Sequence, residues 1–413
     1  MKGLALVFIL FVHFGLWWGN DTWASLWAFS VIFCFRIFGP VNFIFTSIFG
    51  VILSLNLRQK KEPGKSELHR LLKRTFMFLV IGTIINTINL WREVVEPTVF
   101  AGFKVLRIVF TWNIFTFLAI AQVIIFFFRR LKKPVQVAIT AGVFIFYYIA
   151  IPIFTGILDR RFIDYQHGDI FMVDVLTGSI LVYFLLFFEN SMAPFIPYIA
   201  VAFLVNIVYS DYLAMLAEPD PDLGRIKRSM KRILVISFVA VGVGILMGFP
   251  LSPGFLNQVD YIRLTNNDAF RIWDPSLGGF PLFLHANNPA FIMFAFGIVS
   301  IIAITGIWKI DMVQRKSKLV DVLAVFGAYS LTAFITHSIA SIFPLSLDLL
   351  PYLALIVPLI VVIVGIFYAW DKKLKGIFSL EWLLKWYMNN NVTALLKQQM
   401  AKNKGPGDEI TRE

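Results

Sequence analysis

The sequence is poor in charged residues and has almost no cysteine. Of its 413 residues only 15% are charged, and Cys34 is the one cysteine. A single cysteine excludes an internal disulfide and a metal site built from paired cysteines. Soluble domains average about 25% charged residues. A chain with 58% hydrophobic residues and so little charge therefore lacks the polar surface that a soluble domain needs.

Several common catalytic motifs are also missing. The sequence has no His-Glu-x-x-His zinc motif and no Gly-Lys-Ser phosphate loop. It has no Gly-x-Ser-x-Gly nucleophile elbow either. We therefore predict no metal site, and we find no soluble segment that could serve an ATP-driven pump.

What the sequence does have is long apolar runs. A membrane-spanning helix needs about 20 mostly apolar residues. Residues 1–18 also have some features of a signal peptide, but we interpret them as the first span. The sequence predicts an all-α, polytopic membrane bundle of about ten transmembrane helices. The candidate spans are 3–19, 37–57, 75–92, 107–128, 135–156, 194–216, 231–250, 289–308, 319–343 and 349–371.

The basic residues predict which way the spans run. There are 37 Lys and Arg against 25 Asp and Glu, and they cluster between apolar runs, as in cytoplasmic loops. An even number of crossings then separates the clusters, so the apolar stretches 22–36 and 172–189 are predicted to be re-entrant or interfacial. Both termini come out cytoplasmic in an integral plasma-membrane protein. The clusters are Arg58–Arg74, Arg129–Lys133, Arg225–Arg232, Lys309–Lys318 and Lys372–Lys375.

The chain is predicted to have three parts. Residues 1–375 form the transmembrane bundle, 376–400 an amphipathic helix at the membrane interface, and 401–413 a disordered cytoplasmic tail. Membrane lipid is therefore an expected partner. Nucleic acid is not an expected partner, because no basic stretch carries interleaved aromatic residues in a soluble setting. The loop 251–288 fits either a substrate-facing lid or a passive cap.

His13 is the first candidate functional residue, because ionisable side chains inside apolar spans are costly and usually functional. Lys2 precedes it by eleven residues, about three helical turns, so the two share a face about 16 Å apart. His13 fits a general base or an acyl carrier. It equally fits a simple hydrogen bond to a neighbouring helix.

Three candidates lie toward the non-cytoplasmic side. Arg36 fits either binding of an anion or snorkelling to the interface. Trp112 and Asn113 stand near the outer half of the fourth span and fit an acceptor pocket. Asn86 and Asn89, three residues apart in the third span, favour helix-to-helix contact.

Two further groups complete the set. His337 shares a predicted helix face with Ser330 and Ser341, which fits either a substrate hydroxyl contact or helix packing. On the cytoplasmic side Arg70, Lys73 and Arg74 follow the positive-inside pattern. Such residues would also bind the phosphates of a cytosolic donor.

The order of several short motifs is similar to that of the transmembrane acyltransferase superfamily. This group contains the family 3 acyltransferases and the heparan-α-glucosaminide N-acetyltransferase relatives, and includes an uncharacterised bacterial branch with a Leu-Glu-Trp tail. Lys2 and His13 reproduce its basic residue, ten intervening residues and His in the first helix. The other matching segments are Phe38–Gly50, Arg70–Asn86, Trp112–Phe115, Phe195–Tyr198, Gly327–His337 and Leu380–Leu384.

The resemblance implies a membrane-embedded enzyme that transfers an acyl group, expected to be acetyl, from cytosolic acetyl-CoA to an envelope carbohydrate or glycolipid on the outer face. His13 and Arg36 would be catalytic. The acceptor would meet Trp112, Asn113 and His337. The donor would meet the basic residues Lys2, Arg70, Lys73 and Arg74.

A second interpretation stays open at this point. The same polar residues would suit a membrane transporter, or an accessory subunit of a larger membrane complex. A homo-oligomer is equally compatible with the sequence.

Overall fold

A computed structural model describes most of the chain. It covers residues 1–18, 39, 41–59, 65–89, 113–159, 195–248, 289–312, 317–343 and 345–389. The predicted re-entrant stretches 22–36 and 172–189, the loop 251–288 and the tail 401–413 lie outside the described residues.

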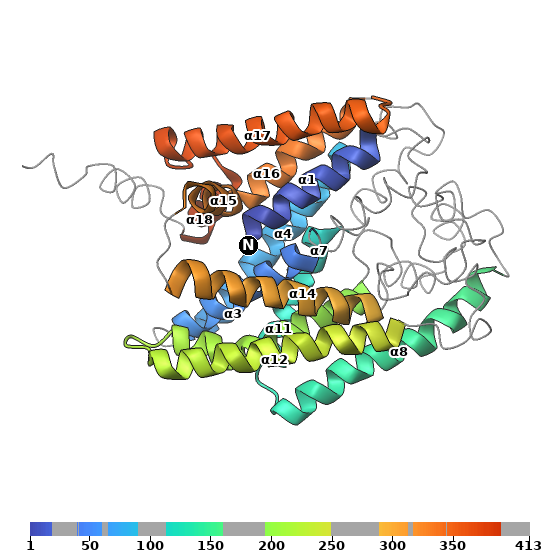
Figure 1. The fold of residues 1–413 in the computed structure, drawn as a ribbon, viewed down its shortest axis with the longest axis vertical. Coiled ribbons are helices and arrows are strands. Elements are labelled where there is room, and N and C mark those ends of the chain that lie inside the picture. Colours follow the sequence, from blue (N-terminus) through green and yellow to red (C-terminus); the bar gives the residue numbers. More distant parts are fainter. Residues whose placement is uncertain are drawn as a thin grey trace, which may run out of the picture.

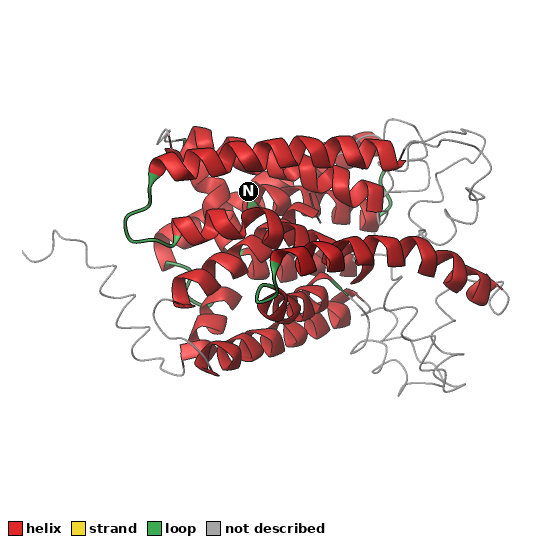
Figure 2. Cartoon of the chain, turned by 90° about the horizontal axis from the view of Figure 1, so that it is seen from below, coloured by secondary structure: helices red, strands yellow, loops and turns green. Residues whose placement is uncertain are grey.

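The described residues are helical and contain no strand (Figure 2). The all-α prediction is thus confirmed for this part of the chain. The helices are α1 (Lys2–Trp18), α3 (Asn42–Gln59), α4 (Lys65–Asn89), α7 (Ile114–Phe128), α8 (Lys133–Asp159), α11 (Phe195–Leu216), α12 (Leu223–Gly248), α14 (Pro289–Gly306), η7 (Ile307–Met312), α15 (Lys318–Ala328), α16 (Ser330–Ser338), η8 (Ile339–Ile342), α17 (Leu349–Leu374) and α18 (Leu380–Asn389).

Each predicted span falls on a helix, but the structure supports fewer membrane crossings than ten. Within the described residues, five helices are long and apolar enough to cross a membrane, and six if the bent pair α15–α16 is one span. The other four spans fall on α1, α3, α7 and α8, whose apolar stretches are 10–17 residues long. The five or six helices that are long enough to cross a membrane are typical of an integral membrane protein. The count of ten stays a prediction.

The predicted span 319–343 is not one straight helix. It breaks at Tyr329, and α15 and α16 meet at 74°. No proline causes the break. Instead Tyr329 donates a hydrogen bond to Asp371 at 2.6 Å, and the carboxylate of Glu381 accepts from the first turn of α16. Because α16 ends at Ser338, Ser341 belongs to the next element, η8, and not to the helix that carries Ser330 and His337.

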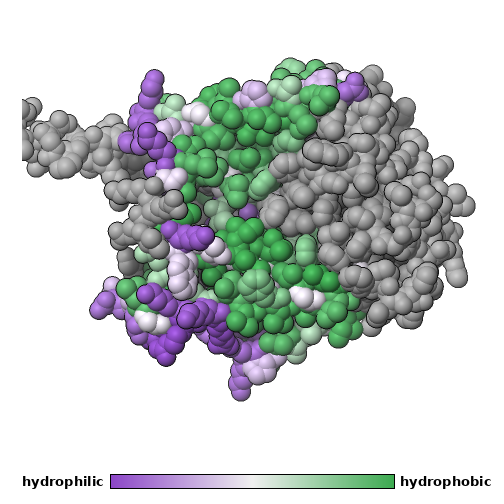
Figure 3. Space-filling model, in the orientation of Figure 1, coloured by the Kyte–Doolittle hydropathy of each residue, from purple (hydrophilic) through white to green (hydrophobic). Residues whose placement is uncertain are grey.

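Polar and apolar residues occupy different parts of the visible surface (Figure 3). Hydrophobic residues cover the middle of the bundle. Hydrophilic residues gather where α17 ends, where α11 joins α12 and where α8 begins, toward the left and lower edges in Figures 1 and 3. Basic residues lie in these places, including Lys372 and Lys373 in the last turn of α17. This apolar middle is what a membrane requires, while the side that faces the cytoplasm stays a prediction.

Glycines bring α12 and α14 into close contact, and these helices form the most extensive pair in the described structure. A Cβ placed on Gly244 would lie 2.5 Å from the backbone nitrogen of Phe294. On the facing helix, a Cβ on Gly297 would lie 2.6 Å from the carbonyl oxygen of Ser237. Small residues at such crossings let helix backbones approach, which is how helices associate in membranes.

We therefore expect Gly244→Ala to lower the free energy of unfolding by about 1–3 kcal/mol. The new methyl group would clash with the backbone of α14, which can move only if the two helices separate. Gly242 on the same helix has no atom within 4 Å of the position that a Cβ would take, so Gly242→Ala should stabilise by up to about 1 kcal/mol through helix propensity. Thermal unfolding in detergent measures both variants. Equal effects would contradict the packing described.

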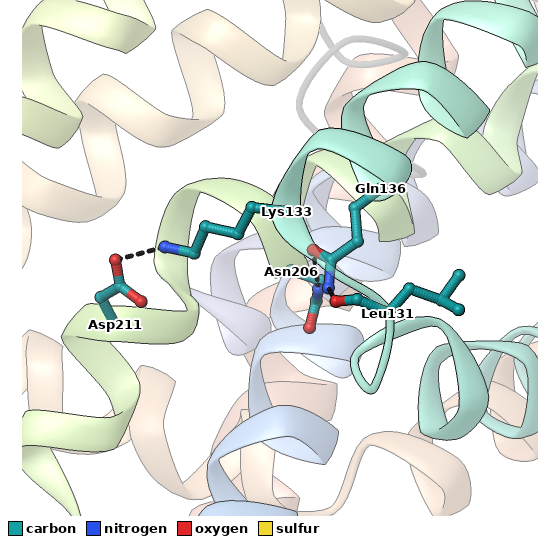
Figure 4. Close-up of polar contacts among 5 residues, drawn as sticks. All are labelled: Leu131, Lys133, Gln136, Asn206 and Asp211. Atoms are coloured by element: carbon teal, nitrogen blue, oxygen red, sulfur yellow. Dashed lines mark hydrogen bonds and ion pairs between the residues drawn. The ribbon is translucent and has the colours of Figure 1, made fainter.

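Helix α8 lies at the outer edge of the bundle (Figure 1), and polar contacts attach its first turns to α11 (Figure 4). Lys133 forms an ion pair with Asp211 at 2.5 Å. Gln136 donates to the carbonyl of Leu131 at 2.9 Å and accepts from Asn206 at 3.1 Å. The amide pair is buried, so it fixes the start of α8 more firmly than the exposed ion pair does.

Of the predicted interfacial segment 376–400, the structure describes the part up to 389. It contains the helix α18, which packs against α16 and α4. α18 is amphipathic. Its location at a membrane interface stays a prediction.

Candidate functional site

Two histidines from opposite ends of the chain meet inside the bundle. Nδ1 of His13 on α1 lies 2.8 Å from Nε2 of His337 on α16. The rings stack, with centroids 5.1 Å apart and planes at 28°. His337 is buried, with 2% of its surface exposed, whereas His13 keeps some accessible surface. Of the two rings, His13 is the more accessible.

The hydrogen bonds define how the pair carries its protons. Nδ1 of His337 lies 3.4 Å from the carbonyl oxygen of Ala333. A carbonyl only accepts, so this contact favours the neutral tautomer with the hydrogen on Nδ1, in which Nε2 is the acceptor. Nδ1 of His13 is then the donor to His337. In this neutral arrangement the lone pair of His13 is on Nε2.

Aromatic rings enclose the pair. Phe334 stands edge-on to His13 at 5.8 Å and to His337 at 4.7 Å between centroids, and Phe14 contacts the ring of His337. Beyond them, the indole of Trp18 donates to the carbonyl of Phe343 at 3.1 Å. An apolar enclosure strengthens the hydrogen bonds inside it, because few solvent dipoles screen them. It also makes a second positive charge on the pair costly.

Lys2 lies at the other end of α1 with charged side chains around it. Its ammonium group stands 5.4 Å from the ring centroid of Phe43 and interacts electrostatically with Arg74 and Glu381. The repulsion from Arg74 opposes the attraction to Glu381. The structure thus brings together Lys2 and Arg74, two of the residues predicted to bind the donor's phosphates.

The other two basic candidates lie on the same helix as Arg74. Lys73 places its ammonium group 6.0 Å from the ring centroid of Tyr387 on α18, and Arg74 stacks over Phe78. Arg70 is exposed. A phosphate group approaching from this side would meet all three along α4, which is compatible with the predicted donor site and with a positive-inside cluster alike.

Asn113 has a clear structural task. As the N-cap of α7, its side-chain oxygen accepts from the backbone nitrogens of Phe115 and Thr116 at 2.9 and 3.1 Å. Its amide nitrogen donates to the carbonyl of Gly82 and to the side chain of Asn86 at 2.9 and 2.8 Å. These bonds use both amide hydrogens and join α7 to α4. They favour a structural function over the predicted contact with the acceptor.

We therefore expect Asn113→Ala to lower the free energy of unfolding by about 2 kcal/mol or more, through loss of the cap and of two buried partners. The matched control is Thr83→Ala on α4. The hydroxyl of Thr83 donates to its own helix at an exposed position, so the change should stay below about 0.5 kcal/mol. If the Asn113→Ala protein is as stable as the wild type and has a raised KM for the acceptor, Asn113 binds the acceptor, as the sequence predicted.

The remaining candidates, Arg36 and Trp112, lie outside the described residues. Among the residues that are described, no group of three or more His, Cys, Asp or Glu side chains could hold a metal ion.

Sequence reasoning missed Glu381, which the structure places at the start of α16. One of its oxygens accepts from the backbone nitrogens of Leu331 and Thr332, and the other accepts from the Thr332 hydroxyl at 2.6 Å. The signal was present as a lone acid in an amphipathic segment rich in aromatic residues. What the sequence could not show is that its partners lie some 50 residues away.

No family model matches the chain, and no curated protein or solved structure matches it either.

Proposed function

We propose that this protein is a membrane-embedded acyltransferase with His13 as its general base. The observation that supports this most is the hydrogen bond between His13 and His337, because it holds the ring of His13 in place and lets His337 stabilise the positive charge that His13 gains when it takes up a proton. The motif order shared with the transmembrane acyltransferase superfamily adds the reaction class.

The proposed reaction transfers an acetyl group to a hydroxyl. Nε2 of His13 takes the proton of the acceptor hydroxyl while the hydroxyl oxygen attacks the thioester carbonyl of acetyl-CoA. The carbon–sulfur bond breaks, an ester forms, and the leaving thiolate takes the proton back from His13. His337 orients the base and stabilises its charged form, as the third member does in a catalytic triad.

The charged residues support a path in which acetyl-CoA enters at the start of α1. Lys2 and Arg74 lie near the start of α1, where the phosphates of the donor would bind by charge. His13 is about three helical turns further along α1, so a thioester at the end of an extended pantetheine arm would reach it. An envelope carbohydrate or glycolipid would arrive from the opposite side.

One observation favours a transporter instead. Broken helices with an N-terminus inside the bundle form the substrate sites of many secondary transporters, and α15 and α16 form such a break. Here Glu381 of the same chain occupies that N-terminus. We therefore place the transporter second.

The test uses the purified protein in liposomes. Acetyl-CoA labelled in the acetyl group is supplied on one face and a carbohydrate–glycolipid fraction on the other, and label in the carbohydrate is counted. Acetyl-CoA at about 100 times its Kd should also add about 2.7 kcal/mol of stability. Absence of both transfer and stabilisation would refute the proposal. Label that crosses the membrane still attached to its original carrier would favour the transporter.

A further inference from the structure

Helix α16 needs a partner at its start, because it is short and carries His337 in its last turn. It spans nine residues, from Ser330 to Ser338, and helices of this length are not stable alone in water. Its own N-cap residue, Tyr329, makes no side-chain capping hydrogen bond. The backbone nitrogens that a cap side chain would normally satisfy are those of the second and third helical residues.

Glu381 supplies that cap from another part of the chain. Its Oε1 accepts from the nitrogens of Leu331 and Thr332, which are the second and third residues of α16. The Thr332 hydroxyl donates to its Oε2 and accepts from the backbone nitrogen of Leu380 at 2.8 Å. A carboxylate at a helix N-terminus is also favoured by the helix dipole.

The carboxylate of Glu381 also interacts electrostatically with α1, the helix that carries His13. Glu381 attracts the ammonium group of Lys2, which begins α1, and His13 lies further along that helix. Glu381 is therefore tied to α16 by hydrogen bonds and to α1 by charge. These are the helices that carry the pair.

The turn before α18 keeps Glu381 in place. Gly376 has φ +72°, and a Cβ there would lie 2.3 Å from the ring of Tyr329. The indole of Trp370 donates to the carbonyl of Ile377 at 3.1 Å, and the hydroxyl of Ser379 accepts from the nitrogen of Trp382 at 3.1 Å. This turn joins α17 to α18 and holds α18 against the break at Tyr329.

We propose that Glu381 is a positioning residue that caps α16 in place of a local side chain and thereby holds His337 at hydrogen-bonding distance from His13. The inference deepens the proposed function, because it names what holds the two histidines together. The inference is tested by the geometry of the His13–His337 pair, and that test is independent of whether the pair transfers acyl groups.

The test compares three substitutions of Glu381 in protein labelled with ¹⁵N at histidine. Glu381→Ala removes the cap, Glu381→Asp keeps the charge but is shorter by one methylene, and Glu381→Gln keeps the reach and an accepting oxygen. We expect the Ala and Asp variants to lose the ring ¹⁵N signals of a fixed His13–His337 tautomer, and the Gln variant to keep them. Asp321, an exposed acid in the first turn of α15, gives the control Asp321→Ala, which should leave the signals unchanged.

Activity gives the second measurement. Displacement of a catalytic group by about 1 Å can cost about 10²-fold in rate, so we expect kcat to fall by up to that factor in the Ala and Asp variants and to recover in the Gln variant. Wild-type ring signals in the Ala or Asp variant would overturn the inference. So would an Asp variant that behaves normally beside a Gln variant that does not, because charge and not capping would then matter. If the ring signals change as expected and the wild-type protein transfers no acyl group, the positioning holds and the proposed function fails.

Discussion

His13→Asn is expected to lower acyl transfer by about 10²–10⁴-fold, the usual contribution of a general base. The Asn amide can still donate to His337 from near the position of Nδ1, while the base atom Nε2 is gone. The variant should therefore fold normally and fail in catalysis. The measurement is kcat in the liposome assay together with thermal unfolding.

The control is His69→Ala, because His69 is exposed on α4 and should leave both quantities unchanged. His337→Ala should reduce kcat as well, and the double variant should lose little more than His13→Asn alone, since paired catalytic groups act as a unit. Full activity in His13→Asn would leave the hydrogen bond between the helices as the whole function of His13.

Gly3→Ala is expected to have the largest effect on packing. A Cβ at Gly3 would lie 1.9 Å from the carbonyl oxygen of Leu323, and one at Gly327 would lie 2.6 Å from the backbone nitrogen of Gly3. Both obstacles are backbone, so α1 and α15 would have to move apart. We expect a loss of about 3 kcal/mol or more in the free energy of unfolding, at the upper end for overpacking.

The shift should also reach the site, because α1 carries His13. Gly3→Ala should therefore lower kcat more than its stability loss explains at temperatures where the variant is folded. Gly306→Ala on α14 is the control, since nothing lies within 4 Å of a Cβ there. If the two variants unfold alike, α1 and α15 do not approach each other as the structure has them.

The helices could be predicted from the sequence, since every candidate span falls on one. Apolar run length carries that information locally. The break at Tyr329 could not be predicted, because the segment around it contains no proline and the contacts that hold it come from Asp371 and Glu381. The even number of crossings between basic clusters assigns each loop to one side of the membrane, and that assignment stays a prediction.

The candidate site was predicted in pieces. His13 and His337 each stand out as ionisable residues in apolar runs, yet nothing in the spacing of residues 324 positions apart indicates that they meet. The hydrogen bond from His13 to a neighbouring helix is what the packing interpretation predicted, while its function as a general base stays a proposal. Asn113 differs most from its predicted function, since its buried amide nitrogen joins α7 to α4 through Gly82 and Asn86, while its side-chain oxygen caps α7.

The most direct test of the central claim is a measurement of the bond between the two rings. In ¹⁵N-histidine protein in lipid nanodiscs, a scalar coupling across the hydrogen bond between Nδ1 of His13 and Nε2 of His337 should be observed, and His337→Gln should abolish it. Two uncoupled imidazoles in the wild-type protein, each exchanging its ring proton with water, would contradict the account.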